Sequence, residues 1–464
     1  MLTIVGGGTP GAFCDGVSRR DFIRVGTLAA AGLSASLPSL LRAEAGSRIG
    51  RSHKAIINVL LPGGPPHQDM VDLKPDAPTE VRGEFRPIDT SVTGVQVSEL
   101  MPRLAEMMDR FTLIRSMVDS QPRHDLYQCV TGHAREESNP PAGGRPSIGA
   151  WISRWAGPVT KEVPPHMSLM YPTIERRWGD PGTGGFLGLS HGPFRLVDGK
   201  KGRDGKGLAH SAQDMVLKGI TLDRLRDREQ LRVSLDHFRR EADARGSMVA
   251  MDEFSAQALG ILTSSRLSDA LDISREDPKV VERYGPANAD FVSDGAPRVT
   301  TNFLVARRLV EAGARYVTLN FSRWDWHGRN FRRAREDVPL LDRALTALVS
   351  DLHERGLDRD VSVVCWGEFG RTPKINRNAG RDHWPKANFA LLAGGGMRNG
   401  QLIGKTDRLA AEPIERPVRF HEVFATLFHN IGLLDAPARE RLFDLRGRPQ
   451  TPVGEGIAPL RELI

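Results

Sequence analysis

Cysteine, aromatic residues and long apolar runs are all scarce in this sequence. It has three cysteines in 464 residues and only 6% aromatic residues, which does not indicate a disulfide-rich protein. Cys365 lies in an apolar run, so we interpret it as a small buried core residue, and a disulfide between it and Cys129 is not indicated. Beyond the N-terminal segment, no stretch is long and apolar enough to span a membrane.

Charge is present in ordinary amounts and is not concentrated in one place. Charged residues make up 26% of the chain, and its formal net charge of +7 is modest for this length. We interpret scattered arginines such as Arg332, Arg333 and Arg335 as a solvated surface rather than a surface that binds nucleic acid or another polyanion. No zinc-finger spacing or basic patch interleaved with aromatic residues supports a nucleic-acid partner.

The N-terminal segment, residues 1–45, has the pattern of an export signal. Arg19 and Arg20 precede a run of small and apolar residues, and Ala43 and Ala45 follow in an A-x-A-like arrangement. The run is interrupted by glycine, serine, threonine and proline, which disfavours a membrane anchor. We therefore predict a twin-arginine (Tat) signal peptide, cleavage near Ala45, and a mature protein in the periplasm or outside the cell.

The rest of the chain, residues 50–464, alternates short apolar strands with helical segments. The clearest predicted strands span 55–61, 111–114, 167–170, 315–321, 361–365 and 389–392. The clearest predicted helices span 146–155, 300–313, 338–355 and 420–431. This alternation predicts a single large α/β domain whose mainly parallel central sheet has helices on both faces. The polar stretch from about 180 to 290 is predicted to be a loop and helix insertion, with a long helical part at 222–262.

Four loops, each placed after a predicted strand, concentrate side chains of the kinds that bind metals. They contain, in chain order, His67 with Asp69, Asp325 with His327, Glu368, and Asp382 with His383. Asp325 and His327 are two residues apart, so on an extended backbone both side chains point to the same face. Because ligands bind at the carboxyl ends of parallel strands, we predict that these residues form a metal site. Imidazoles with carboxylates suit zinc, manganese or iron better than magnesium or calcium.

Each of these residues also has an ordinary structural interpretation. His67 in a proline- and glycine-rich loop can be a surface residue, and Glu368 at a strand end can cap the next turn. The recurrence of the same ligand types at the same end of successive strands favours the metal site, because clustered ionisable groups are costly without a metal or substrate. Arg371, Lys374 and Arg381 can hold an anionic substrate. Alternatively, Arg371 can pair with Glu368, and Lys374 can simply be solvated.

Several motifs resemble those of a known family. The resemblance is carried by GGPPHQD at 63–69, LKPDAPTEVRGEFRPI at 73–88, WDWHGRNF at 324–331, WGEFGRTPKIN at 366–376 and GRDHWP at 380–385. These segments are similar to those of an exported bacterial family called domain of unknown function 1501, over nearly the whole mature chain. The resemblance implies the alkaline phosphatase/sulfatase fold, a large α/β domain with a two-metal site at the strand ends.

The alkaline phosphatase/sulfatase pattern also implies roles for individual positions. Its first metal-binding aspartate follows the first strand, where Asp69 or, alternatively, His67 stands. Its Asp-x-x-x-His resembles Asp325-x-His327 with a shorter gap. Glu368 stands at the place of its Asp-His pair, and His383 resembles its last histidine.

The place of the superfamily nucleophile departs from the pattern. Counting back from the Thr-Gly pair that ends the following helix, the serine, threonine or modified cysteine corresponds to Pro122. Ser120 and His124 are the nearby substitutes, and Cys129 lies inside the predicted helix, outside a Cys-x-Pro-x-Arg context. The resemblance therefore supports the fold more strongly than it supports phosphatase or sulfatase chemistry.

We expect an exported, metal-dependent, hydrolase-like protein that acts on a phosphate or sulfate ester. One or two divalent ions, zinc or manganese, would activate a nucleophile, with His124, Ser120 and Arg371 near the substrate. The expected partner is a small-molecule or polysaccharide ester, with no nucleic acid and no stable membrane span after signal removal. The alternative is a non-catalytic exported binding or cell-envelope protein that keeps the fold. The sequence leaves the oligomeric state open.

Overall fold

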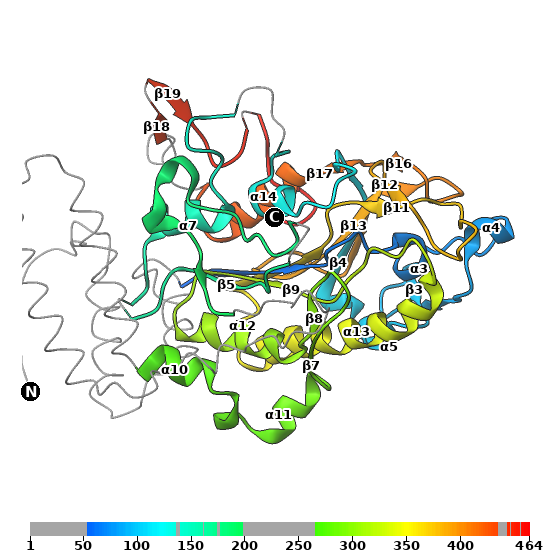
Figure 1. Ribbon diagram of the computed structural model, residues 1–464, viewed down its shortest axis with the longest axis horizontal. Helices are drawn as coiled ribbons and strands as arrows, with labels where there is room; N and C mark the ends of the chain where they lie inside the picture. The colour runs from blue at the N-terminus through cyan, green and yellow to red at the C-terminus, as the bar shows by residue number, and fades with distance from the viewer. Residues whose placement is uncertain are drawn as a thin grey trace, which may run out of the picture.

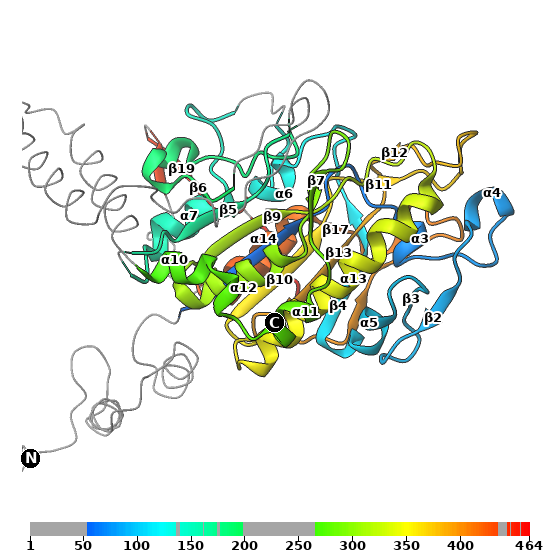
Figure 2. The same cartoon turned by 60° about the horizontal axis from the view of Figure 1, so that its bottom comes forward.

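The computed structural model describes most of the chain that follows the N-terminal segment (Figure 1; Figure 2). The described residues are 53–135, 140–160, 162–173, 177–197, 265–434, 443–445, 447–454 and 456–464. The predicted signal peptide and the predicted helix at 222–262 lie outside them. Within the described ranges, no helix combines the length and the apolar character needed to cross a membrane.

A nine-stranded central sheet organises the protein. Its strands lie in the order β14-β4-β13-β10-β1-β9-β5-β6, and β17 also pairs with β4. Only β13 runs antiparallel to its neighbours, so the predicted mainly parallel sheet is confirmed. The strands are β1 (Ala55–Leu60), β4 (Phe111–Val118), β5 (His166–Leu169), β6 (Phe194–Arg195), β9 (Tyr316–Asn320), β10 (Val361–Trp366), β13 (Asn388–Gly394), β14 (Gln401–Ile403) and β17 (Val418–Arg419).

Strand β1 lies in the middle of the sheet and is buried on both sides, which explains its continuous apolar sequence. Ala55, Ile57 and Val59 belong to the hydrophobic cluster on one face, whereas Ile56 and Leu60 belong to the cluster on the other. This alternation follows from the two-residue period of a strand. It places a helical layer on each face, as Figure 1 shows.

The two helical layers differ in size. The first face is covered by α5 (Pro102–Glu106), α10 (Ser265–Leu271), α11 (Pro278–Arg283), α12 (Thr301–Ala312) and α13 (Asn330–Glu354). The second face carries α6 (Tyr127–Thr131), α7 (Ile148–Ala156) and α14 (Phe420–Asn430). The prediction of helices on both faces is therefore confirmed.

Helix α13 begins eight residues earlier than predicted, at Asn330 instead of Val338. Phe331 and Ala334 are buried and continue its apolar face toward the N-terminus. Pro339 lies inside the helix on an exposed position, where its missing N–H removes one backbone hydrogen bond without breaking the helix. The early start matters because it brings the beginning of α13 to the loops that follow the strands.

Short elements surround the sheet. The two-stranded pairs are β2 (Pro87–Asp89) with β3 (Gln96–Ser98), β7 (Asn288–Phe291) with β8 (Pro297–Arg298), β11 (Gly370–Arg371) with β12 (His383–Trp384), β15 (Lys405–Thr406) with β16 (Pro413–Glu415), and β18 (Phe443–Leu445) with β19 (Arg448–Gln450). The short helices are α3 (His67–Met70), α4 (Thr79–Arg82), η1 (Met108–Arg110), η2 (Gly185–Leu187), η3 (Leu189–His191) and η5 (Ile273–Arg275).

The predicted insertion at about 180–290 is described in part. Its first part forms η2, η3 and the edge strand β6, and its last part forms α10 and α11, which pack with α12 and α13. Residues 198–264 lie outside the described ranges.

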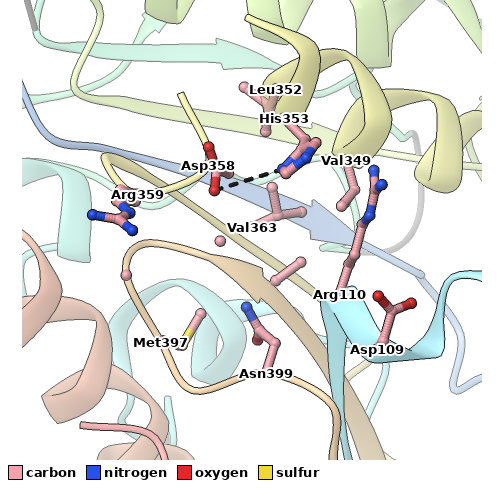
Figure 3. A pocket seen from close by; sticks show the side chains of 13 residues that line it. Asp109, Arg110, Val349, Leu352, His353, Asp358, Arg359, Val363, Met397 and Asn399 are labelled. Carbon is pink, nitrogen blue, oxygen red and sulfur yellow. Dashed lines mark ion pairs between the residues drawn. The ribbon is translucent and has the colours of Figure 1, made fainter. Parts of the chain in front are cut away.

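A hollow of about 530 Å³ lies where β4 and β10 begin (Figure 3). Its lining includes side chains of both charges, among them Asp109, Arg110 and Arg359. His353 Nδ1 lies 3.7 Å from Asp358 Oδ2 on the same wall. The loops that carry the predicted ligands lie at the opposite end of these strands.

Candidate metal centre

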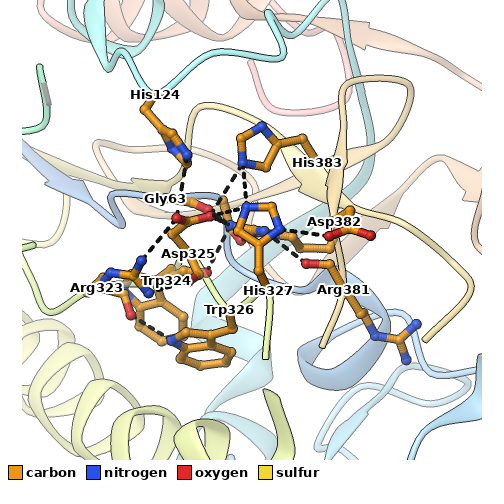
Figure 4. A network of polar contacts seen from close by, with 12 residues as sticks. Gly63, His124, Arg323, Trp324, Asp325, Trp326, His327, Arg381, Asp382 and His383 are labelled. Atoms are coloured by element: carbon orange, nitrogen blue, oxygen red, sulfur yellow. Dashed lines mark hydrogen bonds and ion pairs between the residues drawn. The ribbon is translucent and has the colours of Figure 1, made fainter. Parts of the chain in front are cut away.

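The loops that follow the parallel strands meet at one end of the sheet (Figure 4). Asp325 and His327 follow β9, and His124 follows β4. His383 begins β12, which pairs with β11 so that His383 lies opposite Arg371. Because β4, β9 and β10 run in the same direction, their carboxyl ends share this edge of the sheet.

Four side chains bring their metal-binding atoms together: His124, Asp325, His327 and His383, with these atoms all within 4.8 Å of one another. His327 Nε2 lies 2.9 Å from Asp325 Oδ1 and 3.0 Å from His383 Nε2. His383 Nε2 lies 3.3 Å from the same carboxylate oxygen, and His124 Nε2 lies 3.5 Å from Asp325 Oδ2. Ligand atoms about 2.1 Å from a tetrahedral zinc ion lie about 3.4 Å apart, so this spacing fits one metal ion.

The second ring nitrogens of these histidines have different surroundings. His327 Nδ1 lies 2.7 Å from Asp382 Oδ1, and Asn376 donates to the same oxygen at 3.1 Å. His383 Nδ1 faces the carbonyl of Pro122 at 3.4 Å. His124 Nδ1 is buried and has no hydrogen-bond partner in the part of the chain that the structure describes. Asp382 therefore lies behind a candidate ligand, the usual place of a carboxylate that orients a metal-binding imidazole.

Asp325 is the anionic centre of the cluster. Burial opposes its ionisation, but hydrogen bonds from His327 and His383 and the nearby guanidinium of Arg371 outweigh burial and hold its pKa below the ordinary value. Arg323 donates to Oδ2 at 3.0 Å, while Arg371 donates to Oδ1 at 2.7 Å. The carboxylate is thus ionised and fixed from both sides.

The pKa values of His327 and His124 are shifted in opposite directions. The hydrogen bond to Asp325 raises the pKa of His327, against a smaller opposing effect of burial and with further help from Asp382. Burial lowers the pKa of His124, which therefore favours its neutral, metal-binding form. The hydrogen bond from His327 in turn lowers the pKa of Asp382.

Arg371, predicted near the substrate, is fully buried and has its donors occupied. Its Nε donates to the carbonyl of Gly64 at 2.8 Å, and its other nitrogens donate to the carbonyls of Gly63 and Arg381 and to Asp325. Burial lowers its pKa, and Asp325 partly compensates. The guanidinium therefore ties the loops together and fixes Asp325 rather than facing solvent.

Glu368, a predicted ligand, lies beside the four-residue cluster and is not one of its members. Both of its oxygens accept from the backbone N–H of Gly63, at 2.8 and 3.1 Å, and Trp178 Nε1 donates to Oε1 at 2.8 Å. Gly63 has φ of 107°, and a Cβ there would lie 2.4 Å from the backbone nitrogen of Asp325. Only glycine permits this close approach. Glu368 Oε1 also lies 3.9 Å from His124 Nδ1.

His67 and Asp69 are not in the four-residue cluster either. Asp69 accepts from Arg381 at both oxygens, at 2.7 and 2.9 Å, and from Asn330 at 2.8 Å. His67 Nε2 lies 2.8 Å from the carbonyl of Ala410, and burial lowers its pKa. Fixed partners therefore satisfy Asp69, whereas His67 Nδ1 is buried without a hydrogen-bond partner among the described residues.

Ser120 lies in the loop after β4 that also carries His124. Its side chain is 6% exposed, and its Oγ has no hydrogen-bond partner among the described residues. Pro122, at the place expected for a nucleophile, contributes only its carbonyl, which faces His383. The loop therefore reaches the cluster through His124 and Pro122.

Strained backbone marks the same loops. Among the described residues, seven non-glycine positions have positive φ, and four of them flank the candidate ligands: Asp119, Ser322, Arg329 and Ala379, with φ from 51° to 63°. A left-handed conformation is unfavourable for a residue with a Cβ and persists where the surrounding structure imposes it. Such positions concentrate at functional sites.

Two contributors to the site were not predicted. Arg323 precedes the Trp-Asp-Trp-His motif directly, so its place beside Asp325 could have been proposed from proximity in sequence. Trp178 comes from a loop far away in sequence, donates to Glu368, and lies edge-on to His124 with ring centres 4.8 Å apart. No sequence pattern points to it.

Comparison with known proteins places the chain in a family. The family model described as "Protein of unknown function (DUF1501)" matches residues 53–464. The chain belongs to this family. The resemblance predicted from the motifs is confirmed, and it covers the whole part of the chain that follows the N-terminal segment. None of the curated proteins compared with the sequence matches it.

Several solved structures are similar in arrangement at low sequence identity. They include the PsFucS1 sulfatase from Pseudoalteromonas sp., with 10% identity, TM-score 0.35, and coverage of 86% of this chain and 72% of that one. The phosphonate monoester hydrolase SpPMH from Silicibacter pomeroyi has 9% identity, TM-score 0.35, and coverage of 82% and 73%. The lipoteichoic acid synthase LtaP from Listeria monocytogenes has 10% identity, TM-score 0.32, and coverage of 80% and 75%. Similarity at this level assigns no activity to the chain.

Proposed function

We propose that the protein is an exported metal-dependent hydrolase that acts on phosphate or sulfate esters. The observation that supports this most is the cluster of His124, Asp325, His327 and His383 around one small volume. Asp382 adds a second support, because it accepts from His327 Nδ1 and leaves Nε2 free to bind a metal. Three imidazoles and a carboxylate suit zinc or manganese.

The chain's own residues prepare the site for an ester. When bound, the metal supplies a Lewis acid that polarises an ester and acidifies a water molecule. Arg323 and Arg371 keep Asp325 ionised and oriented. Trp178 and Phe369 are fully buried beside His124 and keep water from that side of the site.

The opposite side of the site is open to a substrate. The side chains of His327 and His383 are 45% and 23% exposed, whereas that of Asp325 is 2% exposed. An ester can therefore approach over the two histidines while the carboxylate stays shielded. Hydrolysis by an activated water requires no side-chain nucleophile, which agrees with Pro122 at the place where one was expected.

Export through the twin-arginine route is part of the same proposal. Arg19 and Arg20 before a weakly apolar run support it, together with the predicted cleavage near Ala45. The mature protein would act in the periplasm or outside the cell, on a small-molecule or polysaccharide ester.

Metal content tests the proposal first. We would measure it by elemental mass spectrometry on the exported, untagged protein, on the variant Asp382→Ala/His383→Ala, and on the control His353→Ala/Asp358→Ala. The control removes the same pair of residue types from the hollow where β4 and β10 begin. We expect stoichiometric zinc or manganese in the native protein and the control, and none in the site variant. Hydrolysis of 4-nitrophenyl phosphate or sulfate should follow the metal content.

A second candidate function is a non-catalytic exported binding protein. The favouring observation is the loop after β4, where Pro122 stands at the place of the expected nucleophile and contributes only its carbonyl. A metal-loaded native protein that hydrolyses neither ester in a broad screen would favour this function. A native protein without metal would contradict the proposed function as a metal-dependent hydrolase.

A further inference from the structure

Three exposed cationic residues lie in the two loops that also carry candidate metal ligands: Arg329, Lys374 and Arg377, which we call the cationic rim. Arg329 follows His327 by two residues. Lys374 and Arg377 lie in the loop between β11 and β12 that leads to Asp382 and His383. The rim therefore belongs to the two segments that supply the exposed side of the cluster.

Backbone and side-chain contacts join these two segments. The N–H of Arg329 donates to the carbonyl of Asn378 at 2.9 Å, and the N–H of Asn330 donates to the carbonyl of Ala379 at 2.8 Å. Asn376 Nδ2 donates to the carbonyl of His327 at 3.0 Å and to Asp382 at 3.1 Å. The rim residues are therefore held next to the site and not on independently moving loops.

The rim differs from the other surface cations nearby in having no anionic partner among the described residues. Arg332 and Arg335, on the next turns of α13, pair with Glu336 at 3.2 Å and Glu84 at 2.7 Å. These loops also carry two carboxylates: Asp382 contacts His327 and Asn376, and Asp325 contacts Arg323, Arg371 and the histidines of the cluster. Positive charge on the two loops that carry the candidate ligands is thus left uncompensated among the described residues.

The backbone of Arg329 adds an independent observation. Arg329 has φ of 55° and ψ of 35°, the left-handed conformation that glycine or asparagine adopts at lower cost. Its exposed side chain makes no hydrogen bond or ion pair within the described structure that would compensate for this strain. Because strained positions cluster at active sites and ligand clamps, Arg329 is a candidate contact for an external ligand.

We propose that the cationic rim binds a second anionic group of the substrate, so that the natural ligand carries several sulfate or phosphate esters along one chain. This inference rests on the proposed function, because it names the class of ester presented to the site. One ester would lie at His327 and His383, and neighbouring esters would lie at Arg329, Lys374 and Arg377. The sequence indicated anion binding as one of two interpretations of Lys374, whereas Arg329 and Arg377 were not predicted to take part.

Nucleic acid, the other common polyanion, fits the rim less well. Proteins that bind single strands stack bases on exposed aromatic side chains. The exposed large hydrophobic residues of the described structure are Leu189, Ile414 and Ile464, and none of them is aromatic. The rim therefore recognises charge without a stacking surface, as suits a sulfated or phosphorylated polymer.

Binding to defined polymers tests the inference. We would titrate the full chain with dextran sulfate, inorganic polyphosphate, unmodified dextran and single-stranded DNA, and repeat each titration with Arg329→Asn/Lys374→Gln/Arg377→Gln. The control Arg86→Gln/Arg154→Gln/Lys279→Gln removes the same charge from exposed positions outside these loops. We expect the native protein and the control to bind dextran sulfate or polyphosphate, and the rim variant to bind at least about 10-fold more weakly. The tighter of the two polymers shows whether the rim prefers sulfate or phosphate groups.

Salt dependence supplies a second readout. Three ion contacts imply that affinity falls about 40-fold between 50 and 200 mM salt, and the rim variant should lose most of this dependence. Equal affinity of the rim variant and the native protein would overturn the inference, as would tighter binding of DNA than of dextran sulfate. Because Arg329→Asn relieves a left-handed strain, the rim variant should unfold at the same or a higher denaturant concentration, which excludes misfolding as the cause.

Titrations with and without a chelator separate this inference from the proposed function. If polymer binding depends on the rim residues and persists without metal, the proposed role of the rim is supported. This holds even if the native protein contains no metal and the proposed hydrolase function is contradicted. If the rim variant contains stoichiometric metal and its polymer affinity is unchanged, the proposed hydrolase function is supported and the proposed role of the rim is overturned.

Discussion

Asp325 and Asp69 are two buried aspartates that follow neighbouring strands of one sheet, yet their surroundings differ. Asp69, 1% exposed, receives Arg381 at both oxygens and Asn330 at one. Asp325, 3% exposed, receives an arginine at each oxygen and also faces the histidines of the cluster. The first carboxylate is satisfied by donors that never lose their protons. The oxygens of the second carboxylate also contact imidazoles, which can lose their protons.

This difference separates a structural carboxylate from a candidate ligand. A bidentate arginine already supplies Asp69 with the charge that a metal would bring. At Asp325, neighbouring imidazoles provide nitrogen lone pairs beside the negative charge, so a metal cation can replace the protons on these nitrogens. Residue type and position after a strand are the same for both aspartates, and only the partners decide their roles.

The largest expected effect comes from breaking the Asp69 pair. Asp69→Ala leaves Arg381 buried and unpaired, so we expect a loss of about 3–5 kcal/mol in the free energy of unfolding. Urea unfolding measures it, with the exposed Asp76→Ala as a control expected to stay within about 0.5 kcal/mol. Metal content per folded molecule should not change, and its loss would make Asp69 a ligand.

Removing a candidate ligand should act on metal affinity. His383→Ala deletes one imidazole of the cluster, and we expect the dissociation constant to rise more than about 100-fold. Competition with a chromogenic chelator measures it, and His353→Ala serves as the control at the other end of the sheet. Retained affinity in His383→Ala would remove His383 from the site.

A smaller effect is expected from the residue behind the ligand. Asp382→Asn keeps the shape but weakens the hydrogen bond to His327 Nδ1, so affinity should fall about 10- to 100-fold. The same chelator competition applies. A loss as large as that of His383→Ala would mean that Asp382 itself binds the metal.

The smallest expected effect is the pH dependence of the metal-free protein. The folded pKa of His327 is raised above 6.5, so its contribution to stability is fully present below about pH 6.5 and is lost as pH rises through the raised value. Urea unfolding in the presence of a chelator measures the free energy of unfolding across this pH window. That free energy should decline less steeply with rising pH in His327→Gln than in the native protein. An identical decline in both would contradict the assignment.

His53 and His166 act in the opposite direction, which is why the variant is needed. Burial lowers the pKa of each to about 4, so the unfolded chain binds protons that the folded chain does not. Their effect on stability is unfavourable, and it grows as pH falls from about 6.5 toward 4. Only the difference between native protein and variant isolates His327.

Much of the fold could be predicted because it depends on local pattern. The apolar runs of β1, β9 and β10 indicate strands buried on both faces, and their alternation with helices indicates a mainly parallel sheet. The early start of α13 was missed. That helix extends because Phe331 and Ala334 find an apolar surface, which is a tertiary contact.

The sequence by itself determined that metal-type side chains follow the strands, since strand direction and the two-residue period place Asp325 and His327 together at one edge. Only the tertiary structure decided which of those side chains meet. His124 joins the cluster from a third loop, Asp69 pairs with Arg381, and Arg371 pairs with Asp325. Among the described residues, Arg329, Lys374 and Arg377 have no anionic partner. Contacts between loops far apart in sequence depend on how the loops pack, and no local pattern encodes that packing.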